Sequence, residues 1–152
     1  MKKLVAILLT IAWLAAPSFA QRIQTSTRLV TIFTRLENEL ALAHANHDDA
    51  KLDRLLATDF EEWTPEPPGD PKPRADWLKQ AGPAAGAQIR QMSARDLGQH
   101  VAVKFVRVGD HAADFIVDIW QKNGDQWHLM ERYRSKVDAA PYSEDVKPTG
   151  KN

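Results

Sequence analysis

Apolar residues recur at every third or fourth position from Leu29 to Ala43. This spacing puts them on one side of a helix and predicts an amphipathic helix over residues 28–46. The two aspartates at 48–49 then offer an N-cap for a shorter helix that runs to Ala57. The predicted buried stripe of the first helix consists of Leu29, Ile32, Phe33, Leu36, Leu40 and Ala43.

The second half of the chain changes to the period of β-strands. A short strand is expected at 60–64, before a loop at 65–73 that holds five prolines in nine residues and a third helix at 74–80. The pair Asn123-Gly124 favours a two-residue hairpin turn, because both residues tolerate positive φ. Four longer strands are predicted, at 88–96, 100–108, 114–122 and 125–136.

This order of elements resembles the nuclear transport factor 2-like superfamily, in particular its SnoaL-like and uncharacterised small-domain branches. Asp53–Phe60 is similar to the family's second helix entering the first strand, and Arg74–Leu78 to its third helix. Phe115–Trp120, followed by Asn123-Gly124 and Trp127, is similar to its closing hairpin. The resemblance covers about residues 28–137.

The resemblance implies an α+β fold shaped like a cone, in which a curved antiparallel sheet wraps around three N-terminal helices and encloses a pocket. The superfamily includes isomerases, dehydratases, cyclases, ligand binders and assembly modules, so a function has to be argued from the site. Its steroid isomerases provide one comparison. Their oxyanion tyrosine falls at Leu40 and their catalytic base at Thr64, and neither residue can do that chemistry. Their buried acid has a counterpart in Asp118.

Asp118 is therefore the candidate catalytic residue. With the predicted hairpin turn, the alternation of side chains places Asp118 on the same face of the sheet as Trp120, Glu131 and Tyr133. The comparison with the steroid isomerases implies that this face points into the pocket. A carboxyl group walled by tryptophan would be poorly solvated and suited to proton transfer. The substitution Asp118→Asn would then stabilise the protein. Alternatively, Asp118 is structural and bonds a neighbouring strand or an arginine such as Arg95.

The tryptophans suggest an apolar ligand site. Trp77 and Trp127 are assigned to the core, whereas Trp63, beside the proline loop, is placed at the mouth of the pocket. A small apolar ligand is the expected partner. The predicted ligand-binding residues are Leu40, Trp63, Trp120, Glu131 and Tyr133.

Basic residues alternate along the last strand. Arg132, Arg134 and Lys136 are predicted to lie on the face opposite Asp118, with Arg107 near them. Such a row is most often a solvated face, although it could bind an anion or a partner subunit.

The chain begins with a basic end, Met1–Lys3, followed by a thirteen-residue apolar run and the small-residue end Ser18–Ala20. This pattern is typical of a secretory signal, and the run is shorter than the roughly 20 residues of a membrane-spanning helix. We expect a signal peptide at 1–20, a single domain at 21–137 and a disordered tail at 138–152. The expected location is periplasmic or secreted, with no membrane attachment after cleavage.

Removal of residues 1–20 takes two lysines from the 20 basic residues, which leaves 18 against 20 acidic ones, a formal charge of −2. No nucleic-acid partner is expected at that charge. His44 and His47 are one helical turn apart beside Asp48, but a zinc site needs three or four ligands, so no metal is predicted. No cofactor motif occurs either, and the absence of cysteine excludes thiol chemistry.

Three functions remain open at this point. The leading one is an exported domain that binds a small molecule in an apolar pocket. The alternatives are an enzyme that uses Asp118 for acid–base chemistry and a non-catalytic assembly module that forms a homodimer through the outer face of its sheet.

Overall fold

The structure, a computed structural model, describes residues 19–84, 86–109 and 112–142. Residues 1–18 of the predicted signal peptide (1–20) and residues 143–152 of the predicted tail (138–152) lie outside these ranges. The helices are α1 (Phe19–Ala45), α2 (Asp49–Leu55), α3 (Arg74–Trp77) and a final 3-10 turn, Ala140–Tyr142. The strands are β1 (Leu56–Trp63), β2 (Lys72–Pro73), β3 (Gln88–Asp96), β4 (His100–Val108), β5 (Ala113–Asn123) and β6 (Gln126–Val137).

Helix α1 follows the predicted stripe but begins earlier than residue 28. No proline or glycine lies between Phe19 and Arg28, so nothing ends the helix on that side. Its C-terminal turn contains His47 at a φ of 53°, and Asp48 then caps α2 by accepting a hydrogen bond from the Lys51 amide at 3.1 Å. The predicted helix–turn–helix is thus confirmed, but α2 ends at Leu55, and residues 56–57, which were expected in the helix, begin β1. In the described ranges, no helix combines the length and the apolar character needed to cross a membrane.

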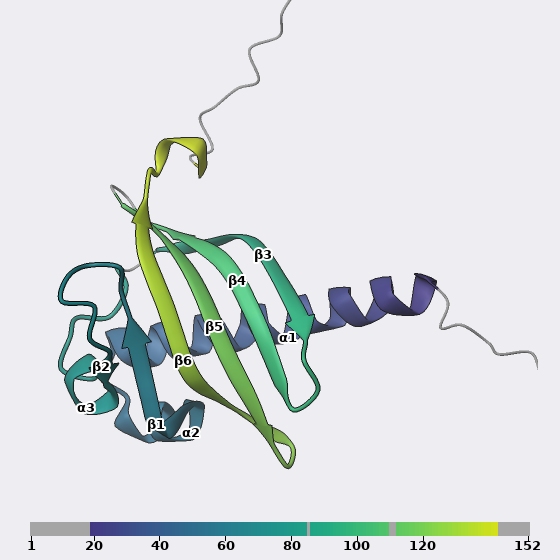
Figure 1. Ribbon diagram of the computed structural model, residues 1–152, viewed down its shortest axis with the longest axis horizontal. Helices are drawn as coiled ribbons and strands as arrows, with labels where there is room; N and C mark the ends of the chain where they lie inside the picture. The colour runs from purple at the N-terminus through teal and green to yellow at the C-terminus, as the bar shows by residue number, and fades with distance from the viewer. Residues whose placement is uncertain (1–18, 85, 110–111, 143–152) are drawn as a thin grey trace, which may run out of the picture.

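The strands form one six-stranded curved sheet in the order β2-β1-β6-β5-β4-β3. The sheet is mixed rather than wholly antiparallel, because β1 pairs with β6 in parallel. Figure 1 shows α1 lying across one face of the sheet, with α2 and α3 beside the β1 edge. The α+β fold implied by the resemblance is confirmed.

The core lies between α1 and the concave face of the sheet. Phe33 contacts Trp120 and Trp127 at ring-centroid distances of 5.8 and 5.1 Å. The other fully buried apolar side chains in this layer include Leu40, Val101, Val103, Phe105, Ile116 and Leu129.

The β5–β6 hairpin differs from the prediction in two ways. Asn123 pairs with Gln126, so the turn is Gly124-Asp125, one residue later than expected. Further along, Trp120 pairs with Leu129 while Ile119 pairs with Glu131, which leaves Met130 as an extra residue, a β-bulge.

The bulge reverses which side chains of β6 point inward. Because side chains alternate along a strand, one extra residue exchanges the two faces beyond it. Asp118 therefore pairs with Arg132, and the next inward pair is Ile116 with Arg134. The prediction that Glu131 and Tyr133 face the interior is wrong, and so is the prediction that Arg132 and Arg134 lie outside.

Candidate functional site

A buried ionic cluster links the middle of α1 to the sheet. The Arg132 guanidinium donates from Nε to Asp118 Oδ1 at 2.9 Å and from Nη2 to Asp118 Oδ2 at 2.5 Å. The same Nη2 donates to Glu37 Oε2 at 2.9 Å. All three side chains are buried. Despite the cost of burial, pairing with Asp118 raises the pKa of Arg132, so this guanidinium stays charged.

Glu37 is the acid of the cluster that holds a proton most readily. Its Oε1 accepts a hydrogen bond from Trp120 Nε1 at 2.9 Å, and the carboxyl group also hydrogen-bonds Asp118. Complete burial raises the pKa of Glu37 well above 4.5, and the neighbouring Asp118 carboxylate raises it further. Two carboxyl groups beside one guanidinium do not both ionise readily, and Glu37 is the one whose pKa is raised.

Arg107 is held only loosely by this cluster. Its Nη2 lies 3.5 Å from Glu37 Oε2 and 3.5 Å from the Glu37 backbone oxygen. Burial lowers the pKa of Arg107 to about 10, and repulsion by Arg132 adds to this effect. Arg107 is thus a buried cation whose nearest acid, Glu37, lies 3.5 Å away and has a raised pKa.

A second group of charges lies beside the first. Glu62 on β1 accepts hydrogen bonds from Trp77 Nε1 at 3.1 Å and from Arg134 Nε and Nη2 at 3.2 and 3.1 Å. Lys72 lies 3.5 Å from the same carboxylate, and Arg134 Nη1 lies 3.8 Å from Asp114. These contacts join β1 to β6, to β2 and to α3, and they join β6 to β5.

His44, near the C-terminal end of α1, stacks on Trp77 with ring centroids 3.8 Å apart and planes inclined by 21°. It is buried, and its Nε2 has no hydrogen-bond partner. Burial lowers the pKa of His44, as does the charge of Arg132, so the imidazole is neutral near pH 7. A buried polar atom without a partner is costly and indicates a place for a ligand or a water.

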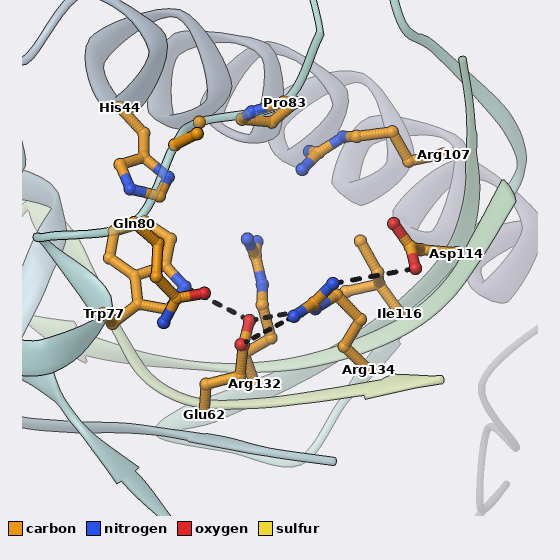
Figure 2. A pocket seen from close by; sticks show the side chains of 12 residues that line it. His44, Glu62, Trp77, Gln80, Pro83, Arg107, Asp114, Ile116, Arg132 and Arg134 are labelled. Atoms are coloured by element: carbon orange, nitrogen blue, oxygen red, sulfur yellow. Dashed lines mark hydrogen bonds and ion pairs between the residues drawn. The ribbon is translucent and has the colours of Figure 1, made fainter. Parts of the chain in front are cut away.

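These groups line a cavity of about 180 Å³ between α1, the segment after α3 and the sheet. Figure 2 shows His44 and Trp77 on one side of it and Arg107 on the other, with Arg132 and Arg134 between them. Glu37 and Asp118 lie behind Arg132 and do not line the space. The remaining lining residues are Glu62, Gln80, Ala81, Gly82, Pro83, Asp114 and Ile116.

The structure places the predicted interior residues in the core rather than at this cavity. Asp118 is buried on the predicted face, but both of its carboxylate oxygens are bonded to Arg132. Its partner is not Arg95, which lies on β3. Trp120 and Leu40 are fully buried packing residues, and neither lines the cavity.

Two predicted ligand-binding residues meet elsewhere, on the outer face of the sheet. Trp63 and Tyr133 stack with ring centroids 6.3 Å apart and border an apolar groove of about 360 Å³ together with Phe115 and Val117. Glu131, beside them, accepts a hydrogen bond from the Tyr133 hydroxyl at 2.8 Å. Trp63 is therefore not at the mouth of the inner cavity.

The residues that line the cavity were missed or assigned to the wrong face. The basic row Arg132 and Arg134 was assigned to the outer face because the bulge at Met130 was not foreseen. Arg107 lies on β4 in alternation with the buried Val101, Val103 and Phe105, so its inward direction does not depend on the bulge. A signal was present in α1. Glu37 and His44 both fall on the buried stripe, at positions in helical spacing with Leu40, and polar residues there indicate a buried polar network.

Within the described ranges, no three histidine, aspartate or glutamate side chains are grouped so that they could hold a metal ion. The ionisable groups of the cavity are arranged as guanidinium–carboxylate pairs instead. Chemically, this arrangement offers hydrogen-bond donors and positive charge to a small guest.

No protein-family model matches the chain, and no curated protein matches it. Solved structures do. An NTF2-like protein from Cytophaga hutchinsonii aligns with a TM-score of 0.59 and 16% identity, over 70% of this chain and 97% of its own. The CaMKII hub of S. rosetta aligns at 0.58 and 17%, over 71% and 96%. A putative ketosteroid isomerase from Parabacteroides distasonis aligns at 0.56 and 18%, over 71% and 87%.

At sequence identities this low, the similarity concerns the fold alone, and all three solved structures share that fold with this chain. The chain has the nuclear transport factor 2-like fold, as its order of helices and strands implied.

Proposed function

We propose that this protein binds a small organic monoanion, a carboxylate, in the cavity between α1 and the sheet, with Arg107 as the anchoring residue. The observation that carries the proposal is the state of Arg107. It is a buried cation whose nearest carboxyl group, that of Glu37, is 3.5 Å away and has a raised pKa, so Glu37 gives up its proton less readily than an ordinary glutamate and is a poor counterion. A buried charge without a close counterion is unfavourable, and a bound anion would supply one.

The charges around the cavity support a single negative charge on the ligand. The cationic side chains in and behind the cavity are Lys72, Arg107, Arg132 and Arg134. The ionised carboxylates among them are Glu62, Asp114 and Asp118 when Glu37 is neutral. Four positive charges against three negative ones leave one positive charge without a counterion. A ligand with a single negative charge balances it, whereas a doubly charged phosphate would exceed it.

The dimensions and walls restrict the ligand further. A volume of about 180 Å³ is below the range of roughly 300–1,000 Å³ for sites that take drug-sized molecules. Trp77, Pro83 and Ile116 supply apolar wall, and His44 Nε2 offers a neutral hydrogen-bonding atom. We therefore expect a carboxylate with a short apolar body rather than the wholly apolar ligand expected from the tryptophans.

Solved structures with this fold include a hub domain and a putative ketosteroid isomerase, which is consistent with a ligand-binding or an assembly role. Ligand binding is favoured for the inner cavity because its groups point inward, away from any partner. No observation favours catalysis by Asp118, whose carboxylate is occupied by Arg132 and set back from the cavity.

Acetate, butyrate and benzoate are expected to bind the purified protein, and Arg107→Met is expected to weaken them by about 10- to 100-fold. A hydrogen bond to a charged group contributes about 1.5–3 kcal/mol, and about 1.4 kcal/mol is a factor of ten. Calorimetric titration measures the affinities. Arg95→Met is the matched control, because Arg95 is exposed on β3 and remote from the cavity lining.

Butyramide, which has nearly the shape of butyrate but no charge, should bind much more weakly. The proposal fails if no carboxylate binds the wild type at millimolar concentration, or if Arg107→Met and Arg95→Met bind butyrate equally well.

Carboxylate affinity is expected to depend on the proton of Glu37. Above the folded pKa of Glu37, ionised Glu37 would itself neutralise Arg107, so affinity should fall about tenfold per pH unit. Glu37→Gln cannot ionise and should show a flat affinity between about pH 6 and pH 9, where the probe stays charged. Burial lowers the pKa of His44 below its ordinary value of 6.5, so His44 is mainly neutral from pH 7 upward.

The free energy of unfolding should also depend on whether Glu37 is protonated. The pKa of Glu37 is raised on folding, so its contribution is complete below the unfolded pKa and is lost as pH rises through the folded one. Urea melts of Glu37→Gln should then vary less with alkaline pH than those of the wild type. An equal decline in both proteins would show that another group titrates.

A further inference from the structure

Two oppositely charged side chains stand next to each other on the wall of the cavity. Arg107 on β4 and Asp114 on β5 are paired in the register of the sheet, and both line the cavity. Directly paired residues of antiparallel strands have their Cβ atoms about 4.5–5.5 Å apart. Figure 2 shows both side chains on the side of the cavity away from His44. The sheet therefore presents a cation and an anion to the same part of the cavity.

In the part of the chain that the structure describes, these two neighbours form no ion pair with each other. Asp114 Oδ1 lies 3.8 Å from Arg134 Nη1, which is too far for a hydrogen bond, and has no hydrogen-bond partner. Arg107 Nη2 lies 3.5 Å from Glu37 Oε2 on α1. Each of the two charges is therefore only weakly matched by the protein itself.

A hydroxyl group close to a carboxylate would satisfy both residues at once. The guanidinium of Arg107 has only hydrogen-bond donors, whereas an ionised aspartate has only acceptors. A molecule that bridges Arg107 and Asp114 therefore needs an acceptor with a negative charge at one point and a donor close to it. A hydroxy acid has both groups, and a plain carboxylate has only the first.

We propose that the ligand of the cavity is a short hydroxy acid, whose carboxylate binds Arg107 and whose hydroxyl group, on carbon 2 or carbon 3, donates a hydrogen bond to Asp114. The inference rests on the carboxylate site proposed above and makes Asp114 the residue that determines its specificity. The hydroxyl group is placed near the carboxylate because the two side chains leave the sheet from paired positions. The apolar end of the ligand then contacts the apolar wall formed by Ile116 and Trp77.

An ammonium group could also donate to Asp114, but the charges of the site disfavour an amino acid. A zwitterion has no net charge, so it would leave the excess positive charge of the cavity unbalanced. Its ammonium group would also lie beside Arg134, which is 3.8 Å from the same carboxylate. Like charges this close repel each other, and more strongly in a partly buried site than in water. A hydroxyl group donates the same hydrogen bond without adding a charge.

Calorimetric titration of the wild type with butyrate and its substituted forms tests the proposal. At least one enantiomer of 2-hydroxybutyrate or 3-hydroxybutyrate should bind about tenfold more tightly than butyrate, because hydrogen bonds to charged groups are among the stronger ones. 4-Hydroxybutyrate, whose hydroxyl group is at the far end, should show no such gain. 2-Aminobutyrate should bind more weakly than 2-hydroxybutyrate.

Replacement of Asp114 should change two affinities in opposite directions. Asp114→Ala should lose the preference for the hydroxy acid and should bind butyrate more tightly, because a negative charge beside the ligand is removed. Asp114→Asn keeps an oxygen that accepts a hydrogen bond and should retain part of the preference. An unfolded variant would lose both affinities together, and circular dichroism checks for this.

Glu66→Ala is the matched control. Glu66 is exposed and borders a neighbouring cavity together with Asp114, but it does not line this one. The substitution removes the same charge from the same region, so Glu66→Ala should keep the full preference for the hydroxy acid.

The outcomes separate this inference from the proposal on which it rests. If butyrate binding depends on Arg107 but neither 2-hydroxybutyrate nor 3-hydroxybutyrate binds more tightly than butyrate, the hydroxy acid is wrong and the carboxylate site stands. A preference that persists in Asp114→Ala, a preference for 4-hydroxybutyrate, or tighter binding of 2-aminobutyrate would also overturn the inference. If no carboxylate binds the wild type, both proposals fail.

Discussion

Replacement of Asp118 by alanine is expected to destabilise the protein by about 3–5 kcal/mol near pH 7, the usual cost of removing one partner from a buried ion pair. Two of the hydrogen bonds of Arg132, at 2.9 and 2.5 Å, end on this carboxylate. Without it, the buried guanidinium loses both of these hydrogen bonds and keeps only the one to Glu37. The desolvated charge of Arg132 is then compensated far less well.

Asp118→Asn should also be destabilising, although it preserves the shape of the side chain. This sign is opposite to the one expected for an unpaired carboxyl group in an apolar pocket, where Asn would have been the more stable residue. Asp114→Ala is the matched control, because Asp114 lies 3.8 Å from Arg134 and is about one quarter exposed. It should change stability by no more than about 1 kcal/mol.

Urea unfolding of the four proteins at pH 7 measures these differences. If Asp118→Asn is as stable as the wild type or more so, Asp118 is not the counterion of Arg132. The account of the buried cluster would then be wrong.

Gly82→Ala is expected to cost about 1–3 kcal/mol and to weaken carboxylate binding. A Cβ at this position would lie 2.6 Å from Ala45 Cα and 2.8 Å from the carbonyl carbon of His44, both of them backbone atoms of α1. Backbone atoms of a helix cannot move aside as the end of a side chain can. The segment Ala81–Pro83 would therefore shift away from His44. Because this segment and His44 both line the cavity, the shift would widen it.

Gly109→Ala is the control for this substitution. A Cβ there would meet the Ala112 carbonyl oxygen at 3.7 Å, an ordinary contact, and Gly109 does not line the cavity. Thermal melts and butyrate titrations of the two variants give the comparison. Equal melting temperatures and equal affinities would show that residue 82 does not need to be glycine.

The sequence did not reveal which charged side chains pair with one another inside the domain. A row of arginines on a strand is normally exposed, since arginine is almost never fully buried unless paired. Its burial here depends on partners that are distant in sequence: Arg132 meets Glu37 across 95 positions. Hydrogen bonds of this kind depend on which strand lies beside which and on the face that each residue presents.

Local patterns did determine the elements and the fold. The apolar repeat from Leu29 to Ala43 defined the buried side of α1, Asp48 defined the start of α2, and alternation defined the four long strands. These features depend on interactions between residues close in sequence, and their order was enough to indicate the nuclear transport factor 2-like fold.

Only the tertiary structure decided the site. A bulge of one residue at Met130 exchanges the two faces of β6 beyond it, and this moved Arg132 and Arg134 inside and Glu131 and Tyr133 outside. Nothing in the local sequence marks the bulge, because it depends on how β6 must run to pair with β5 while its arginines reach the acids of α1 and β1. Periodicity determined where the strands lie, but the packing of the whole domain determined which face of the last strand became the site.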